Sequence, residues 1–300
     1  MSALEAELRT RFGARLERGQ PLASLTSFRI GGPADFFIEV AGEDELSSVL
    51  AAARRHQVPA VCLGSGTNIL VSDRGIRGLV VRLGAGFSEI GFDGCHVRAG
   101  AAAQFGALVA QAVARGLAGL EFGEGIPGSV GGALIMNAGA FGGEMAPVVS
   151  AVRGADPDGR LRTLAKDEIE FLYRRSILPP GFIVSAVEFD LVRGDRNALS
   201  TKVAELKTKR AARQPLGMPN AGSIFKNPPG NFAGRLLEKC GLKGERRGGA
   251  AFSERHANFI VNLGGAQASE VRELIELARR RVEEQTGVRL EPEVKLVGEW

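Results

Sequence analysis

The segment PNAGSIFKNP, at residues 219–228, places Ser223 among small residues, with Lys226 three positions later. A nucleophilic serine normally acts with a neighbouring base such as histidine, and this segment contains none. Three interpretations are open for Ser223: a loop residue, a phosphate ligand, or a hydroxyl that gives up its proton instead of attacking with its oxygen. The small residues Ala221 and Gly222 would allow a ligand to approach the backbone closely.

The first glycine loop is LGSGTNIL, with Gly64, Ser65, Gly66, Thr67 and Asn68 at its centre. It lacks the third glycine of a dinucleotide-binding fingerprint, and no helix pattern follows it, so a Rossmann site is excluded. Glycine N–H groups with two hydroxyl side chains favour an anion-binding nest. An ordinary turn at the end of a strand explains the motif equally well.

The second glycine loop is EFGEGIPGSVGGALIMNAGAFGGE, at residues 121–144. Ser129 is placed to cap a short helix that runs to about residue 139. Glycines inside a helix cost about 1 kcal/mol each relative to alanine, so Gly131 and Gly132 need a reason. Close approach of a flat or phosphorylated ligand is one reason, and tight packing of the helix on a sheet is the other.

These loops must be held by alternating helices and strands. Helical spacing predicts an amphipathic N-terminal helix, with Leu4, Leu8 and Phe12 on its buried face. The further expected elements are strands at 36–40, 182–192 and 288–298, and helices at 43–58, 103–116, 194–215 and 269–286, the last capped by Ser269 and stopped by Gly287. The residue composition changes near residue 194, which indicates an α+β assembly of two domains with a boundary within 194–215.

Composition narrows the class of protein. With 300 residues, 44% hydrophobic and 24% charged, the chain is typical of a globular protein of two domains, and it has no apolar run long enough for a membrane span. The net charge of +4 suits a small anionic ligand, whereas one Trp and one Tyr argue against nucleic acid. The scattered Cys62, Cys95 and Cys240 lack metal spacing, so we expect a reduced, cytoplasmic protein without a metal.

Five motifs occur here in the order found in the UDP-N-acetylenolpyruvoylglucosamine reductase family: LGSGTNIL, GIPGSVGGALIMNAGAFG, YRRS, NAGSIFKNP and EPEV. The chain resembles that family from about residue 26 to 298. The resemblance implies an α+β vanillyl-alcohol-oxidase (PCMH)-type FAD-binding region of two lobes at 27–193, after an N-terminal helix at 1–26. It also implies a smaller α+β substrate-binding domain at 194–300, whose C-terminal strand carries a catalytic glutamate.

The family's activity is the NADPH-dependent, FAD-mediated reduction of UDP-N-acetylglucosamine enolpyruvate to UDP-N-acetylmuramate, a peptidoglycan precursor. The resemblance implies non-covalent FAD, because the first loop has no His or Cys to attach it. The matching cofactor residues are Gly64, Ser65, Gly66, Thr67, Asn68, Ile126, Pro127, Gly128, Ser129, Gly132, Asn137, Ala138 and Gly139. The single Tyr173 and the short path after it indicate the family form without an extra tyrosine loop.

The resemblance gives three residues catalytic roles. Hydride goes from reduced flavin to the vinyl carbon, and Ser223 then donates a proton to the α-carbon. Arg174 of YRRS holds the carboxylate and its enolate, and Arg175 has no match in the motif. Glu291 and Glu293 would lie on one side of an extended segment, so geometry leaves both open, and the resemblance selects Glu293.

Substrate contacts implied by the resemblance are Arg213, Lys226, Asn227, His256 and Asn258. A structural role for His256 is equally open. The expected partner is the small-molecule sugar nucleotide, with no nucleic acid or membrane, and we expect a monomer. Two rival functions are an oxidase of the same flavin superfamily and a nucleic-acid-binding module that uses KTKRAAR and ERRGG. For those basic runs, a solvated helix is the better explanation.

Overall fold

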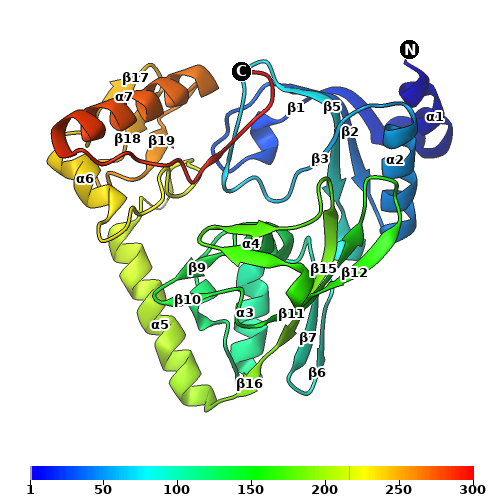
Figure 1. Cartoon of the computed structure of the whole chain (residues 1–300), viewed down its shortest axis with the longest axis horizontal. Helices are drawn as coiled ribbons and strands as arrows, with labels where there is room; N and C mark the ends of the chain where they lie inside the picture. The colour runs from blue at the N-terminus through cyan, green and yellow to red at the C-terminus, as the bar shows by residue number, and fades with distance from the viewer. Residues whose placement is uncertain (1, 216) are drawn as a thin grey trace. The chain divides into compact units, whose positions relative to one another are not determined.

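A computed structural model describes residues 2–215 and 217–300, which form two compact units (Figure 1). The first unit consists of Met1–Arg18, Phe36–Ser65 and Gly78–Arg210, and the second of Gly19–Asp35, Gly66–Arg77 and Ala211–Trp300. The change of unit at Arg210 lies within the range 194–215, but the units are not two continuous stretches of chain. The long helix α5 stays with the first unit as far as Arg210, and two early segments join the second.

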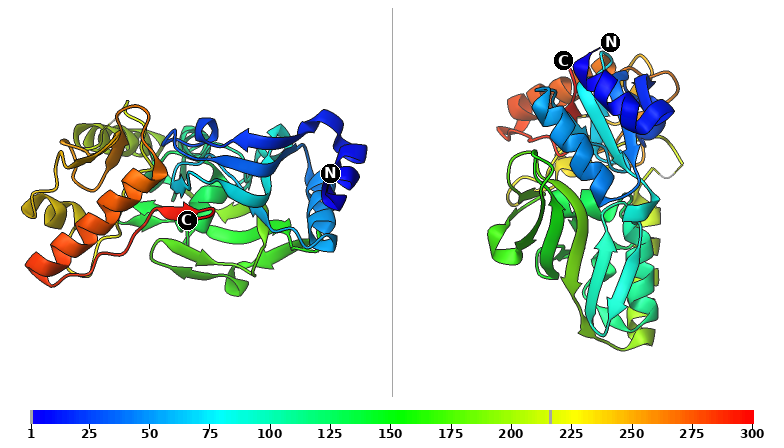
Figure 2. Two further views of the ribbon diagram at one scale, coloured as in Figure 1. Left: turned by 90° about the horizontal axis from the view of Figure 1, so that it is seen from above. Right: turned by 90° about the vertical axis from the view of Figure 1, so that its right-hand side faces the viewer.

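One lobe packs two helices on a four-stranded sheet of order β1-β2-β5-β3, most of whose residues belong to the first unit. Figure 2 shows α1 and α2 together on this sheet. Its elements are α1 (Ala3–Phe12), β1 (Leu16–Pro21), β2 (Pro33–Val40), α2 (Glu43–Arg55), β3 (Ala60–Cys62) and β5 (Ile76–Leu83). Leu4, Leu8 and Phe12 are buried as predicted. The helix is shorter than expected, because Gly13 ends it with a φ of 57°, and a 3₁₀ turn (Gly13–Arg15) then leads into β1.

The other lobe of the first unit is built on a five-stranded antiparallel sheet of order β12-β11-β15-β7-β6. Helix α3 lies beside β6 and β7 in both figures. The sheet strands are β6 (Ile90–Asp93), β7 (His96–Gly100), β11 (Val149–Ala155), β12 (Leu161–Ala165) and β15 (Ile183–Asp190). The helices are α3 (Phe105–Ala114), α4 (Val130–Ile135) and α5 (Arg196–Arg213). Short pairs complete the lobe: β8 (Leu117–Ala118) with β16 (Val192–Arg193), β9 (Gly139–Ala140) with β10 (Gly143–Glu144), and β13 (Glu170–Leu172) with β14 (Arg175–Ile177).

The second unit packs α7 on a three-stranded antiparallel sheet and against α6. Its elements are β4 (Ile69–Val71), α6 (Ala233–Lys239), β17 (Arg246–Arg247), β18 (Ala250–Phe252), β19 (Ile260–Asn262), α7 (Ala268–Thr286) and β20 (Lys295–Val297), which pairs with β4 in parallel. The predicted cap at Ser269 is wrong. Gln267 occupies the N-cap position of α7, and both carboxylate oxygens of the distant Asp73 accept backbone N–H groups of its first turn.

Helices and strands thus alternate around separate buried cores, two in the first unit and one in the second. The predicted α+β class is confirmed. The end of the chain is less regular than expected, because only three residues of the predicted strand at 288–298 form β20. Among the described residues, no helix combines the length and the apolar character needed to cross a bilayer. All three cysteines are free thiols.

Candidate active site

The two glycine loops meet within the first unit. A β-carbon on Gly64 would lie only 3.0 Å from Ser129 Oγ, so the start of the first loop touches the middle of the second. Ser129 caps α4 as predicted, because its hydroxyl accepts the Gly132 N–H at 3.3 Å. Gly64 and Ser129, 65 positions apart in the sequence, therefore lie on one backbone surface. The remainder of the first loop, from Gly66 onward, belongs to the second unit.

The glycines of these loops serve different purposes. Gly131 is buried, and a β-carbon there would lie 2.9 Å from Ala101 Cβ, so helix–sheet packing explains it. Gly132 is exposed, and the nearest atom to an added β-carbon is Ser129 Oγ at 3.4 Å. Gly66 has a φ of 62° and would place a β-carbon 2.4 Å from a backbone oxygen, so a local turn requires it. Gly64 and Gly132 are both exposed, so each presents bare backbone to a ligand.

Asn137 ends α4 and links the second loop to the hairpin that carries Arg174. Its φ of 38° lies in the left-handed region, and the residue is 1% exposed. Its amide nitrogen donates to the Leu172 carbonyl and to the Glu144 carboxylate, both at 3.1 Å. Its amide oxygen accepts the Ala146 N–H at 3.0 Å. The helix therefore stops at residue 135 instead of 139, and the Asn137 side chain is used within the protein.

Arg174 occupies the two-residue turn between β13 and β14, where Leu172 pairs with Arg175. Its φ of 59° is unusual for a residue with a β-carbon, and such conformations concentrate at functional sites. The guanidinium lies 5.0 Å from the ring centre of Tyr173, which is 49% exposed. Below the turn, the buried Ser176 hydroxyl donates to the Leu134 carbonyl of α4. Arg174 is thus held half-buried, whereas Arg175 is exposed.

The Ser223 loop is fixed inside the second unit by its neighbours. Gly222 adopts a φ of 74°, and its N–H donates to the Asn220 side chain at 2.9 Å. The buried Asn258 clamps the other side, because its amide both donates to the Phe225 carbonyl and accepts the Phe225 N–H. Ser223 itself is half-buried, and no described residue hydrogen-bonds to its hydroxyl. That hydroxyl is therefore available to a ligand.

Glu293 lies directly beside the Ser223 loop. Its N–H donates to the carbonyl of Ile224 at 2.7 Å, and Ile224 is the residue that follows Ser223. Its own carbonyl accepts the Asn68 side-chain amide at 3.2 Å. Glu291 differs from it, because its exposed carboxylate pairs with the Lys226 ammonium at 2.5 Å. The structure thus separates two glutamates that sequence spacing left equivalent, and it brings Ser223, Glu293 and Asn68 together.

The predicted substrate contacts have uneven surroundings. Arg213 is exposed at the last residue of α5. The Asn227 side chain accepts the Ala233 N–H at the start of α6. The ring of His256 packs edge-on against Phe259 with 5.0 Å between centroids, and burial lowers its pKa. Its ring nitrogen Nδ1 accepts the backbone N–H of Asn258. These observations favour a structural role for an uncharged His256 ring. Direct contact with the substrate stays a prediction for all five residues: Arg213, Lys226, Asn227, His256 and Asn258.

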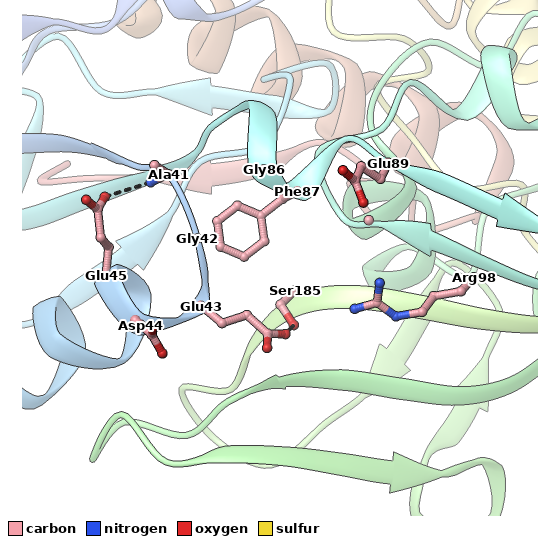
Figure 3. Close-up of a pocket in the computed structure, with 11 residues that line it drawn as sticks. Ala41, Gly42, Glu43, Asp44, Glu45, Gly86, Phe87, Glu89, Arg98 and Ser185 are labelled. Atoms are coloured by element: carbon pink, nitrogen blue, oxygen red, sulfur yellow. Dashed lines mark hydrogen bonds between the residues drawn. The ribbon is translucent and has the colours of Figure 1, made fainter.

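A pocket of about 610 Å³ lies elsewhere in the first unit, at the start of α2 (Figure 3). None of the predicted site residues lines it. Its principal carboxylate, Glu43, accepts both arms of the Arg153 guanidinium at 2.7 Å and the Ser185 hydroxyl at 2.8 Å. The Arg153 hydrogen bonds keep the pKa of Glu43 below its ordinary value. This carboxylate joins α2 to the strands beneath it, so the pocket has a structural explanation.

Comparison with known proteins identifies the family. A model of the UDP-N-acetylenolpyruvoylglucosamine reductase C-terminal domain matches residues 214–297, and an FAD-binding domain model matches 34–165. The reductase 2 of Symbiobacterium thermophilum is 50% identical over 99% of this chain and 98% of its own length. The chain belongs to the UDP-N-acetylenolpyruvoylglucosamine reductase family. The reductase of Agathobacter rectalis is 44% identical, with 95% of each chain covered.

A solved structure agrees with this assignment. The reductase of Thermus caldophilus superposes with a TM-score of 0.82 at 40% identity, and the match covers 94% of this chain and 99% of that one. The chain is therefore an FAD-dependent oxidoreductase of this family. The open backbone at Gly64 and Gly132 fits such a cofactor, since neither glycine presents a side chain to a ligand. In this reductase family member, the N–H of Glu293 donates to the carbonyl of Ile224, the residue that follows Ser223.

Proposed function

We propose that this protein reduces UDP-N-acetylglucosamine enolpyruvate to UDP-N-acetylmuramate with NADPH as the reductant. The observation that carries the proposal is the pairing of the Ile224 carbonyl with the Glu293 N–H, which holds Ser223 and Glu293 side by side. Ser223 keeps a hydroxyl that no described residue engages, and Glu293 is half-buried. This is the arrangement expected of a proton donor beside an acidic group, in a chain that belongs to the family.

FAD, when bound, supplies a hydride carrier between NADPH and the sugar nucleotide. The residues proposed to hold it are those of the two glycine loops, 64–68 and 126–139. Two observations support this assignment: Gly64 lies next to Ser129, and the backbone of Gly132 is exposed. We assign cofactor binding to residues 27–193 and substrate binding to 194–300. The FAD-binding model at 34–165 and the reductase C-terminal model at 214–297 support this functional division.

In the reaction, the enolpyruvyl double bond gains a hydride at its terminal carbon and a proton at the carbon that bears the carboxylate. Arg174 holds the carboxylate with its planar fork and stabilises the negative charge that develops there. Glu293 shares that stabilisation. Ser223 gives its proton to the α-carbon, a transfer that needs no histidine because the enolate is itself a strong base. Lys226, Asn227, Arg213, His256 and Asn258 are proposed to surround the remainder of the sugar nucleotide.

The protein is proposed to be the family form without the extra tyrosine loop. Only residues 178–182 separate β14 from β15, which is too short for a closing loop. The single Tyr173 instead lies in the β13–β14 turn beside Arg174. A nucleic-acid function is disfavoured, because described members of the basic runs are paired with acidic residues: Lys209 with Glu205, and Arg247 with Glu245.

An anaerobic absorption experiment tests the function. NADPH is added to the FAD-loaded protein, followed by UDP-N-acetylglucosamine enolpyruvate. The proposal predicts that the flavin bands bleach with NADPH and return with the sugar nucleotide. Bands that return only on admission of air would support an oxidase of the same superfamily instead. UDP-N-acetylglucosamine, which lacks the enolpyruvyl group, is the matched control and should leave the bands bleached.

A further inference from the structure

Arg210 is a half-buried cation beside the proposed site that belongs to none of the five family motifs. It lies in the last turn of α5, within the first unit. Its side chain crosses the bare α-carbon of Gly125, where a β-carbon would lie 2.8 Å from Arg210 Cδ and 3.1 Å from Nε. Its guanidinium lies 5.5 Å from the ring centre of Phe141. Both neighbours come from the second glycine loop.

The guanidinium has donors without acceptors. Nε and Nη2 are inaccessible to solvent, and neither finds a hydrogen-bond partner within residues 2–215 and 217–300. Burying such a donor without an acceptor is unfavourable, and more so when the group is charged. Other cations of α5 are not in this position. Lys202 pairs with Glu121 at 3.0 Å, and Lys209 extends to Glu205 from an exposed site.

The charges around Arg210 also favour an anion. Burial lowers the pKa of Arg210, Glu124 partly offsets this effect, and the positive charge of Arg174 lowers the pKa further. Two guanidinium groups thus repel each other within one unit. Glu124 lies close enough to act through space, but it forms no ion pair with Arg210 at 4.0 Å or less in the described chain. A bound anion would relieve the repulsion and engage the buried donors.

We propose that Arg210 is a second anion-binding residue of the active site, which acts beside Arg174 on a delocalised oxyanion present during the reaction. The inference rests on the proposed function, which supplies two sources of such an oxyanion. One is the carboxylate of the enolpyruvyl substrate, and its enolate. The other is the negative charge that FAD gains on reduction. The planar fork of arginine matches either source.

The test uses three variants of the FAD-loaded protein. Arg210→Met removes the charge and keeps most of the stem, and Arg210→Lys keeps the charge without the fork. Lys209→Met, one residue earlier and exposed, is the matched control for lost charge. Thermal unfolding of each variant checks the fold. Binding to the oxidised protein is measured from the perturbed flavin spectrum, with UDP-N-acetylglucosamine enolpyruvate and with UDP-N-acetylglucosamine, which has no carboxylate. The midpoint potential of the bound flavin is measured separately.

If the oxyanion is the substrate carboxylate, Arg210→Met weakens binding of the enolpyruvyl compound about tenfold and leaves binding of UDP-N-acetylglucosamine unchanged. If it is the charge on reduced FAD, the preference for reduced over oxidised cofactor falls about tenfold, which lowers the midpoint potential by about 30 mV for two electrons. Arg210→Lys should recover part of either effect, and Lys209→Met should cause neither.

The inference is overturned if Arg210→Met, folded and loaded with FAD, changes neither the binding ratio nor the potential relative to Lys209→Met. It is also overturned if both sugar nucleotides weaken equally, since that result indicates a general structural role. Failure of the proposed function is recognised separately: the unaltered protein would then show no return of the flavin bands with the enolpyruvyl substrate.

Discussion

Replacement of Asn137 by alanine should destabilise the first unit and displace the turn that carries Arg174. Asn137 is 1% exposed, and its amide makes three hydrogen bonds, two of which fix the Leu172 carbonyl and the Ala146 N–H. Alanine makes none of them. It would also have to adopt a φ of 38°, which asparagine tolerates better than alanine.

The magnitude follows from these contacts. Each neutral hydrogen bond contributes about 1 kcal/mol, and the one to the Glu144 carboxylate about 1.5 kcal/mol or more. The left-handed backbone adds about 1 kcal/mol for alanine. The free energy of unfolding should therefore fall by about 4 kcal/mol. Asn137→Gly loses the same hydrogen bonds without the backbone strain, so it should be about 1 kcal/mol less destabilising than Asn137→Ala.

The assay is urea unfolding of the unaltered protein and the two variants, followed by far-UV circular dichroism, with the midpoint and slope compared for each transition. The kcat of the folded Asn137→Ala variant should also fall at least tenfold, because a shift of about 1 Å in a positioned group is costly to catalysis. The reasoning is refuted if Asn137→Ala unfolds within about 1 kcal/mol of the unaltered protein. It is also refuted if glycine is the more destabilising replacement.

Three further predictions concern the site and the fold. Arg174→Lys keeps the positive charge but loses the planar guanidinium fork. It should slow reoxidation of the flavin by the sugar nucleotide at least tenfold in stopped-flow absorption and leave flavin reduction by NADPH unchanged. The control Arg175→Lys should resemble the unaltered protein. Gly131→Ala should destabilise the protein by about 1–3 kcal/mol through overpacking. Gly132→Ala should instead weaken FAD binding and cause a smaller loss of stability in thermal unfolding. If Gly132→Ala were the more destabilising of the two, the packing explanation for Gly131 would be rejected. Burial lowers the pKa of His256 below its ordinary 6.5, so on acidification the unfolded chain binds a proton that the native chain does not. The free energy of unfolding should therefore fall as the pH drops from 7 to 5.5. In urea titrations at both pH values, His256→Gln should reduce this dependence on pH.

Local chemistry made much of the fold predictable. The amphipathic spacing that ends at Gly287 identified α7, and the hydroxyl of Ser129 identified the start of α4. The predictions that were wrong depended on distant partners. Ser269 was chosen as a cap on local grounds, whereas Asp73, nearly two hundred residues away, accepts the first N–H groups of α7.

The candidate site shows the same division between local and distant effects. Motif resemblance indicated Ser223 and Glu293, but only the folded chain brings the two together through the Ile224 carbonyl. Spacing could not separate Glu291 from Glu293, because the deciding contact is an ion pair with Lys226, 65 residues away along the chain. Arg210 could not be recognised within its basic helix, because nothing in the sequence distinguishes a guanidinium with buried donors from solvated ones.

The central claim, that Ser223 is the proton donor, is tested most directly by stopped-flow absorption of Ser223→Ala under anaerobic conditions. The variant is first reduced with NADPH and then mixed with UDP-N-acetylglucosamine enolpyruvate. Proton transfer by a positioned group contributes about 10²–10⁴-fold in rate. The return of the flavin bands should therefore slow at least a hundredfold, with bleaching by NADPH unaffected. Return of the bands within about threefold of the unaltered rate would contradict the claim.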